Sequence, residues 1–174
     1  GFRTELINKI VGFNPHITVK PYDTKINPAR FYNSQLDLIS ENLISSNSGE
    51  SIILKNEISK GIILRGYRSD DFSKLQIIDN DSFVGNKDAL INNNISISKE
   101  LSFTLDLKIG DKITLMSSAG LETIIGNLPK QKTFTIISLF ESGLIDFDNN
   151  IAFINLVTLE DFLNFDFKDR NLEI

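Results

Sequence analysis

Side chains able to perform acid–base or metal chemistry are few in this 174-residue chain. There is no cysteine, and His16 is the only histidine. This composition excludes thiol nucleophiles, disulfides and zinc sites of the His/Cys type, and it leaves a single candidate base for a Ser-His-Asp triad. His16 follows Pro15 at an expected helix end, where a surface imidazole is the commoner interpretation.

Three pairs of carboxylates lie close together in the sequence: Asp70 and Asp71, Asp79 and Asp81, Asp146 and Asp148. Their Asn, Ser and Gly neighbours are typical of solvated loops, and no calcium-loop spacing with a closing Glu follows. The glycines show neither the P-loop nor the dinucleotide-binding spacing. We therefore expect no cofactor, no metal and no enzyme activity; a small enzyme with an unrecognised site is kept as an alternative.

Composition sets the class of protein. Hydrophobic residues make up 41% and charged residues 24%, which is ordinary for a globular chain with a core. The net charge of −5 and the pI near 4.9 argue against a nucleic-acid partner, because binding phosphates needs a clustered basic face. The chain starts at Gly1 without a signal peptide, and its apolar stretches fall short of a membrane span, so we expect a piece of a longer protein.

The ends of the chain have helical periodicity. Apolar residues at helical spacing predict a helix over 2–13, and Asn27-Pro28 is a helix start for a second helix that runs to residue 43. A short strand is expected over 17–19, and the Ser/Asn/Gly cluster over 45–49 is expected to be a turn.

The middle of the chain has β-type patterns. Strands are predicted over 51–55, 61–67, 95–97, 112–116, 133–140 and 151–156, with 79–94 irregular. The first two should form an antiparallel pair. Ser98 and Thr158 are expected to cap short helices. Strands in the middle and helices at the ends predict an α+β fold.

The segment 117–130 lies between two predicted strands and is too long for a tight hairpin. It carries Leu121, Ile124, Ile125 and Leu128, which a solvated loop has no reason to hold. These residues either fold back onto the core or form a protruding apolar arm for a partner. Taken by itself, the segment favours folding back, since burial is the default for apolar residues.

Several motifs, in order, resemble the periplasmic domain of LolC/LolE-type lipoprotein-releasing ABC transporter permeases, within the MacB-like superfamily. They lie at 1–17, 97–101, 109–115, 126–134, 140–146 and 152–156. The most specific is Gly-Asn-Leu-Pro-Lys-Gln-Lys-Thr-Phe at 126–134, which resembles the segment that closes the protruding hook of the LolC-type subunit. The last two motifs resemble the hairpin that follows it.

The resemblance implies a β-rich Sabre-like subdomain inserted in a Porter-like α/β subdomain. Residues 1–50 would be the first part of the Porter-like subdomain, following a transmembrane helix. Residues 51–164 would be the Sabre-like part with the hook at 117–129, and 165–174 the start of the return to a Porter-like part that this chain leaves incomplete.

The same resemblance implies a role and partners. The domain would face the periplasm from the bacterial inner membrane and dock the periplasmic lipoprotein carrier chaperone while lipoproteins are released. A second permease subunit, cytoplasmic ATPase subunits and lipoprotein substrates would complete the system. A MacB-like efflux permease domain that transmits motion, and the hookless partner permease of the same complex, are the alternatives.

Carried onto this sequence, the resemblance gives a set of partner-binding residues in the hook and in a polar pad at its base: Leu121, Thr123, Ile124, Ile125, Gly126, Leu128, Pro129, Gln131 and Lys132. Ile124 and Ile125 would lie near the tip. Lys132 stands where the family has Arg, which keeps the charge but loses bidentate hydrogen bonding. A third pad position, at or near Thr114, is basic in the family and is not basic here.

Overall fold

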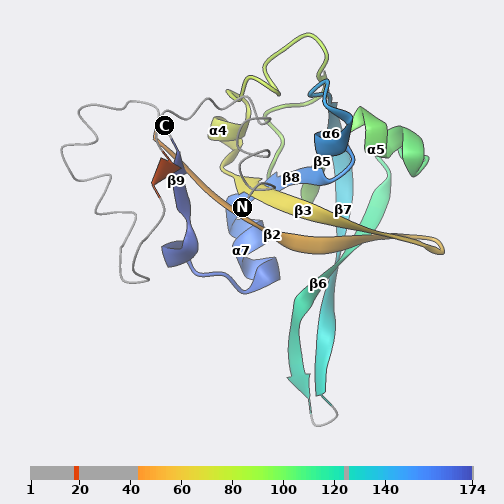
Figure 1. The fold of residues 1–174 in the computed structure, drawn as a ribbon, viewed down its shortest axis with the longest axis vertical. Helices are drawn as coiled ribbons and strands as arrows, with labels where there is room; N and C mark the ends of the chain where they lie inside the picture. The colour runs from red at the N-terminus through yellow and green to blue at the C-terminus, as the bar shows by residue number, and fades with distance from the viewer. Residues whose placement is uncertain (1–17, 20–42, 124–125, 174) are drawn as a thin grey trace.

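A computed structural model describes residues 18–19, 43–123 and 126–173 of the chain. The helix predicted over 2–13 lies outside the described residues, and so does the second predicted helix except for Leu43, which is not helical. Figure 1 shows a strand-rich body from which one long hairpin extends. The strand-rich, mixed sheet confirms the α+β prediction in its coarse form.

The described strands are β1 (Thr18–Val19), β2 (Ile44–Lys55), β3 (Ile58–Tyr67), β4 (Val84–Gly85), β5 (Asn94–Ser98), β6 (Lys112–Thr123), β7 (Gly126–Phe140), β8 (Ile151–Asn155) and β9 (Asn171–Glu173). The helices are α4 (Ser69–Phe72), α5 (Lys99–Thr104), α6 (Ile145–Asp148), α7 (Leu156–Leu163) and the 3₁₀ turn η1 (Phe167–Asp169). Every strand predicted over the described residues is present, and β2, β6 and β7 are much longer than predicted.

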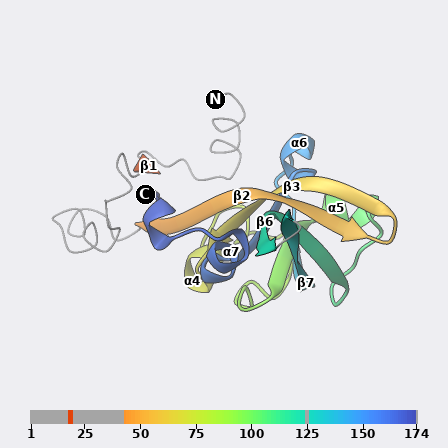
Figure 2. The ribbon, with the colours of Figure 1, turned by 90° about the horizontal axis from the view of Figure 1, so that it is seen from below.

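The described sheet closes on itself. Its strands follow the order β1-β9-β2-β3-β8-β5-β7-β4, and β6 pairs with both β2 and β7. The strands β2, β3, β8, β5, β7 and β6 therefore form a closed ring, a small barrel without free edges. The pairs β3–β8 and β5–β7 are parallel, and the other pairs of the ring are antiparallel. Seen along the hairpin, β2 and β3 run as one long curved ribbon across the molecule (Figure 2).

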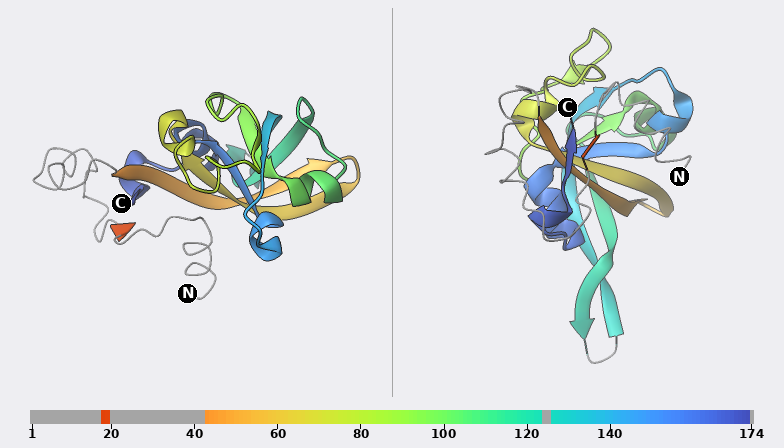
Figure 3. Two further views of the ribbon diagram at one scale, coloured as in Figure 1. Left: turned by 90° about the horizontal axis from the view of Figure 1, so that it is seen from above. Right: turned by 60° about the vertical axis from the view of Figure 1, so that its left-hand side comes forward.

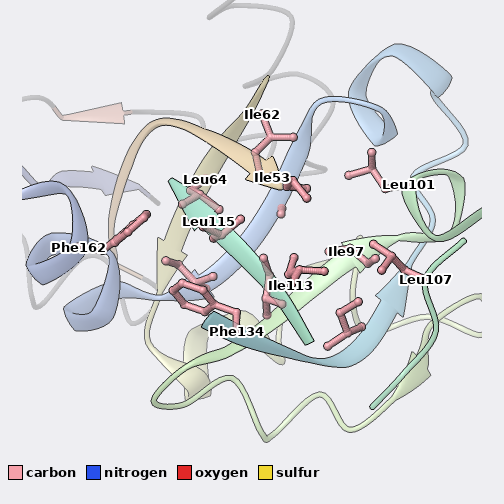
Figure 4. Close-up of a cluster of buried hydrophobic side chains, with 14 of the residues drawn as sticks. Ile53, Ile62, Leu64, Ile97, Leu101, Leu107, Ile113, Leu115, Phe134 and Phe162 are labelled. Atoms are coloured by element: carbon pink, nitrogen blue, oxygen red, sulfur yellow. The ribbon is translucent and has the colours of Figure 1, made fainter. Parts of the chain in front are cut away.

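The interior of the ring is filled by side chains from all six of its strands. Representative members, each nearly inaccessible to water, are Ile53, Leu64, Ile97, Leu115, Phe134 and Ile154. Figure 4 shows Phe162 and Leu101 on opposite sides of this cluster, so α7 and α5 pack against it from two directions. The Phe134 and Phe162 rings meet edge to face with centroids 5.9 Å apart.

A second apolar cluster lies on the other face of β3 and β8. The Phe153 ring contacts Tyr67, Phe72 and Phe140 with centroid distances of 6.0, 5.5 and 5.0 Å. Residues 73–93, predicted to be irregular over most of this length, cover the cluster with Leu75, Ile78 and Leu90 and contain only the two-residue strand β4. Burial of these side chains explains how a polar segment is held in place without regular structure.

The turn predicted over 45–49 is wrong, because these residues belong to β2. Ser46 pairs with Tyr67 of β3 on one side and with Asn171 of β9 on the other. A Cβ at Gly49 would lie 2.5 Å from Leu163 Cδ1, so a glycine lets α7 and the strand approach closely. Tertiary pairing therefore overrides the local turn preference of the Ser/Gly cluster.

Two further predictions need correction. The last α-helix begins at Leu156 and is capped by Asn155, whose side chain accepts from the N–H groups of Val157 and Thr158; Thr158 is inside the helix rather than its cap. β7 and β8 do not form a hairpin, since β5 lies between them and α6 connects them. By contrast, Ser98 caps α5 as predicted, with its Oγ accepting from Leu101 N at 3.0 Å.

Candidate docking site on the β6–β7 hairpin

The outer half of the β6–β7 hairpin leaves the barrel. β6 pairs with β2 only from Thr114 to Met116, and β7 pairs with β5 from Thr135 onward. Between these points and the closing pair Thr123–Gly126, the two strands pair only with each other among the described residues. Figures 1 and 3 show this twisted ribbon extending far from the body of the protein.

This geometry decides between the two interpretations of the segment 117–130. The backbone does not fold back onto the core, as the segment by itself favoured, but protrudes. The prediction that this connection is too long for a tight hairpin is also wrong, since Thr123 is the register partner of Gly126 and only two residues separate the strands. β-pairing between the two arms satisfies the backbone groups that an irregular loop would leave to water.

Proline and glycine shape the hairpin. Pro129, which has no N–H to donate, stands opposite a register shift between Ser117 and Gly120, where β6 carries two extra residues. Gly126 begins β7 at φ +124°, a backbone conformation that side chains disfavour. Pro129 and Gly126 were both among the predicted site residues, and in the structure both shape the backbone of the hairpin.

The structure describes only some of the predicted apolar hook residues. Leu121 and Leu128 are register partners near the outer end, and the side chain of Leu128 is 49% exposed. Ile124 and Ile125 lie outside the described residues. Leu128 on this protruding ribbon is a candidate anchor for a partner, because burying its exposed half would stabilise a complex by roughly 1 kcal/mol.

The predicted pad residues do not share one face. Gln131 is exposed and pairs with Met116, whereas the next residue, Lys132, pairs with Leu115 on the opposite face of the strand. The Lys132 ammonium lies 3.7 Å from Asp161 Oδ2 on α7. Thr114 pairs with Thr133, on the same face as Gln131. Among the pad positions, Lys132 is thus turned toward α7 rather than grouped with Gln131.

Two lysines tie the root of the hairpin to α7. Lys130 Nζ donates to the carbonyl oxygen of Asp161 at 2.9 Å, and Lys132 reaches the carboxylate of the same residue. Deeper in the barrel, Phe134 packs on Phe162 of the same helix. The root is therefore fixed by a buried ring contact and two polar contacts, so the ribbon leaves the barrel in a set direction.

A buried polar cluster, which the sequence analysis missed, lies beside β9. Arg65 Nη2 donates to Glu173 Oε1 at 2.8 Å, Ser46 Oγ donates to the same oxygen at 2.8 Å, and Tyr67 OH donates to Oε2 at 3.3 Å. Burial, more than any other influence, raises the pKa of Tyr67 well above its ordinary value. The available signal was Arg65 itself, a charge in the middle of an apolar strand.

The carboxylate pair on α6 also differs from its prediction. Asp148 is not a solvated loop residue but is 4% exposed, and its carboxylate accepts from the N–H and the hydroxyl of Ser142. Burial raises the pKa of the Asp148 carboxyl, while the bonds from Ser142 act in the opposite direction. This carboxylate anchors the loop between β7 and α6.

Within the described part of the chain, no group of three or more His, Cys, Asp or Glu side chains is placed to hold a metal ion. None of the helices described is both long and apolar enough to cross a membrane. A hollow of about 470 Å³ lies where β2 and β3 meet the root of the hairpin, lined by Glu50, Ser51, Ile52, Gly61, Ile62, Met116, Ser117 and Pro129.

Known proteins resemble this chain in sequence and in fold. No family model matches the chain. It is 28% identical over 116 residues to the lipoprotein-releasing system transmembrane protein LolC of Xylella fastidiosa strain Temecula1, covering 66% of this chain and 28% of that protein. It is 22% identical over 162 residues to LolC of Neisseria meningitidis serogroup B, covering 90% and 39%. The chain thus spans well under half the length of these curated relatives.

Among solved structures, the extracellular domain of the noncanonic ABC-type transporter YknZ from Gram-positive bacteria matches 98% of this chain and 71% of its own, with a TM-score of 0.53 and 12% identity. A domain of a putative permease from Porphyromonas gingivalis matches 76% of this chain and 54% of its own, with a TM-score of 0.47 and 14% identity. The fold resembles that of the extracellular domain of an ABC-type transporter. The predicted resemblance to a LolC-type protein is confirmed by the similarity in sequence.

Proposed function

We propose that this chain is the periplasmic domain of an inner-membrane ABC transporter permease that releases lipoproteins, and that its β6–β7 hairpin docks a periplasmic lipoprotein carrier. The observation that carries the proposal is the hairpin itself, whose outer half pairs with no third strand among the described residues. The relatives named as lipoprotein-releasing proteins supply the class of transport. The role is binding and transport rather than catalysis.

The hairpin has two means of holding a partner. The outer edge of each strand presents backbone N–H and C=O groups, to which a partner strand can add hydrogen bonds. Apolar side chains such as Leu128 enter an apolar cavity of the partner, burying surface at about 25 cal/mol per Å² less the cost of ordering the complex. A few central residues then dominate the affinity.

The subdomain division belongs to the same proposal. The Sabre-like part corresponds to 51–164 and holds the barrel and the hook at 117–129. The Porter-like part corresponds to 1–50 and to the return segment 165–174. Pairing of β9 with β1 and β2 supports a return of the chain to its start, while β2 itself runs across residue 50 without a break.

The partners follow from the proposal. The carrier binds the hairpin, lipoproteins are the transported substrates, and the domain faces the periplasm from the inner membrane. A second permease subunit and cytoplasmic ATPase subunits act through the rest of the permease. The site comprises the hook and pad residues, with Lys132 available to a partner only when it leaves Asp161.

The test is titration calorimetry of the 174-residue chain with the periplasmic lipoprotein carrier of the same organism. An Ile124→Asp/Ile125→Asp variant should lose binding, because two charges at the expected tip oppose burial. The matched control is Ile58→Asp/Ile145→Asp, which places the same substitutions at isoleucines 51% and 66% exposed and outside the hairpin. Absence of binding by the folded wild-type chain would refute the carrier role.

A second candidate is an efflux-type, MacB-like permease domain that transmits motion. The likeness to the YknZ extracellular domain over 98% of the chain is compatible with either candidate, because a shared fold does not separate the two. The same titration does: a carrier that binds through the hairpin supports lipoprotein release. A folded chain that does not bind the carrier supports the efflux type or the hookless partner permease.

A further inference from the structure

The hollow at the root of the hairpin has walls of two chemical kinds. Ile52, Met116 and Pro129 provide apolar surface, and Glu50 adds an exposed carboxylate at the rim. Met116 and Pro129 belong to the hairpin, and Ile52 is the register partner of Met116. The hollow is therefore continuous with the surface that a partner of the hairpin would cover.

The floor of the hollow is held firmly. Ser51 Oγ donates to the carbonyl oxygen of Met116 at 2.9 Å, and Ile62 and Ser117 are buried. At Gly61 a Cβ would meet no atom within 4 Å, so the space above this glycine is open. A volume of about 470 Å³ is ample for a long side chain.

We propose that this hollow receives a lysine or arginine side chain of the protein that binds the hairpin. The methylene stem of such a side chain would pack on Ile52, Met116 and Pro129 while its cationic head pairs with the Glu50 carboxylate. An acidic side chain would be repelled by Glu50, and a purely apolar one would gain no charge-assisted contact with it. The net charge of −5 on the chain also favours a positively charged group on the partner.

This inference rests on the proposed function, and it adds a contact that fixes the register of the partner on the hairpin. The hairpin supplies apolar area at its outer end, and the hollow supplies one charge-assisted contact at the root. A partner held at both ends of the ribbon cannot slide along it, which a strand-like contact alone would allow.

The experiment titrates the periplasmic lipoprotein carrier into the 174-residue chain and into two variants of the hollow. Glu50→Lys reverses the rim charge, and Gly61→Leu fills the open space. Each should weaken carrier binding about tenfold or more, with the Glu50 effect shrinking at high salt. Matched controls are Glu57→Lys and Ser59→Leu, at exposed positions at the far end of the β2–β3 ribbon, which should bind as the wild type does. Thermal unfolding confirms that each variant is folded.

The outcomes separate the two proposals. If the wild type binds, the Ile124→Asp/Ile125→Asp variant does not, and both hollow variants bind normally, the hairpin docks the carrier and the inference about the hollow is overturned. If both hollow variants weaken binding and their controls do not, the hollow is part of the docking site. If the folded wild type does not bind the carrier, the proposed function falls and the inference falls with it.

Discussion

Arg65 Nη2 and Glu173 Oε1 lie 2.8 Å apart, and both side chains are about 95% inaccessible to water. The pair joins the barrel strand β3 to the last described strand, β9, which also pairs with β1 and β2. Ser46 and Tyr67 donate to the same carboxylate. The contact therefore holds the two ends of the described chain against the barrel.

Breaking this pair should be costly. Arg65→Leu or Glu173→Leu leaves one buried charge without its partner, and each should lower the free energy of unfolding by about 3–5 kcal/mol. The double variant, which removes both charges, should cost less than the sum of the two by about 1–3 kcal/mol. Urea denaturation of all four proteins measures this coupling. Strict additivity would show that the pair contributes no interaction of its own.

Asp148 should give the stability a defined pH dependence. Burial raises the pKa of its carboxyl in the folded protein above the ordinary value of 3.8, so the folded state binds this proton more tightly than the unfolded state. Stability from this group is therefore gained as the pH falls through the raised value and lost as it rises. Relative to Asp148→Asn, the wild type should gain stability between pH 7 and pH 4, as measured by urea denaturation.

Asp146→Asn on the same helix is the control for Asp148, since its side chain is exposed. The raised pKa of Asp148 would be contradicted if the difference in unfolding free energy between wild type and Asp148→Asn stayed constant between pH 7 and pH 4. It would also be contradicted if the wild type lost stability relative to the variant as the pH fell.

Two glycines of the β2–β3 ribbon should respond oppositely to alanine. At Gly49 a Cβ would lie 2.5 Å from Leu163 Cδ1 and 3.0 Å from Phe165 Cε2, so Gly49→Ala should destabilise the protein by about 1–3 kcal/mol. At Gly61 nothing lies within 4 Å, so Gly61→Ala should be neutral or stabilise by up to about 1 kcal/mol. Thermal and urea unfolding compare the two, and equal effects would refute the packing argument.

Asp161 should compete with a partner for Lys132. Asp161→Asn weakens the ionic contact at 3.7 Å, and because Asp161 is exposed the unfolding free energy should change by less than about 1 kcal/mol. The Lys130 contact to the Asp161 carbonyl oxygen does not depend on the Asp161 side chain and should persist. If Lys132 is a docking residue, Asp161→Asn should strengthen carrier binding and Lys132→Ala should weaken it. Unchanged affinity in both variants would remove Lys132 from the site.

The sequence by itself determined the elements whose preference is local or periodic. The alternation over 133–140 places Phe134 and Ile136 inside and their neighbours outside, and Ser98 caps α5, because strand period and capping need only a few adjacent residues. The order of motifs also sufficed for the resemblance to a LolC/MacB-like domain. The lack of cysteine and the single histidine narrowed the chemistry open to this chain on composition alone.

Only the tertiary structure decided what depends on distant partners. The Ser/Gly cluster over 45–49 became a strand because β3 and β9 pair with it, and the segment 117–130 became a protruding ribbon because its two arms pair with each other. The Arg65–Glu173 pair joins residues that are 108 positions apart, and the hollow beside Glu50 exists only where β2, β3 and the hairpin meet. Local patterns carry no information on such contacts, since their energy arises when remote segments exclude water together.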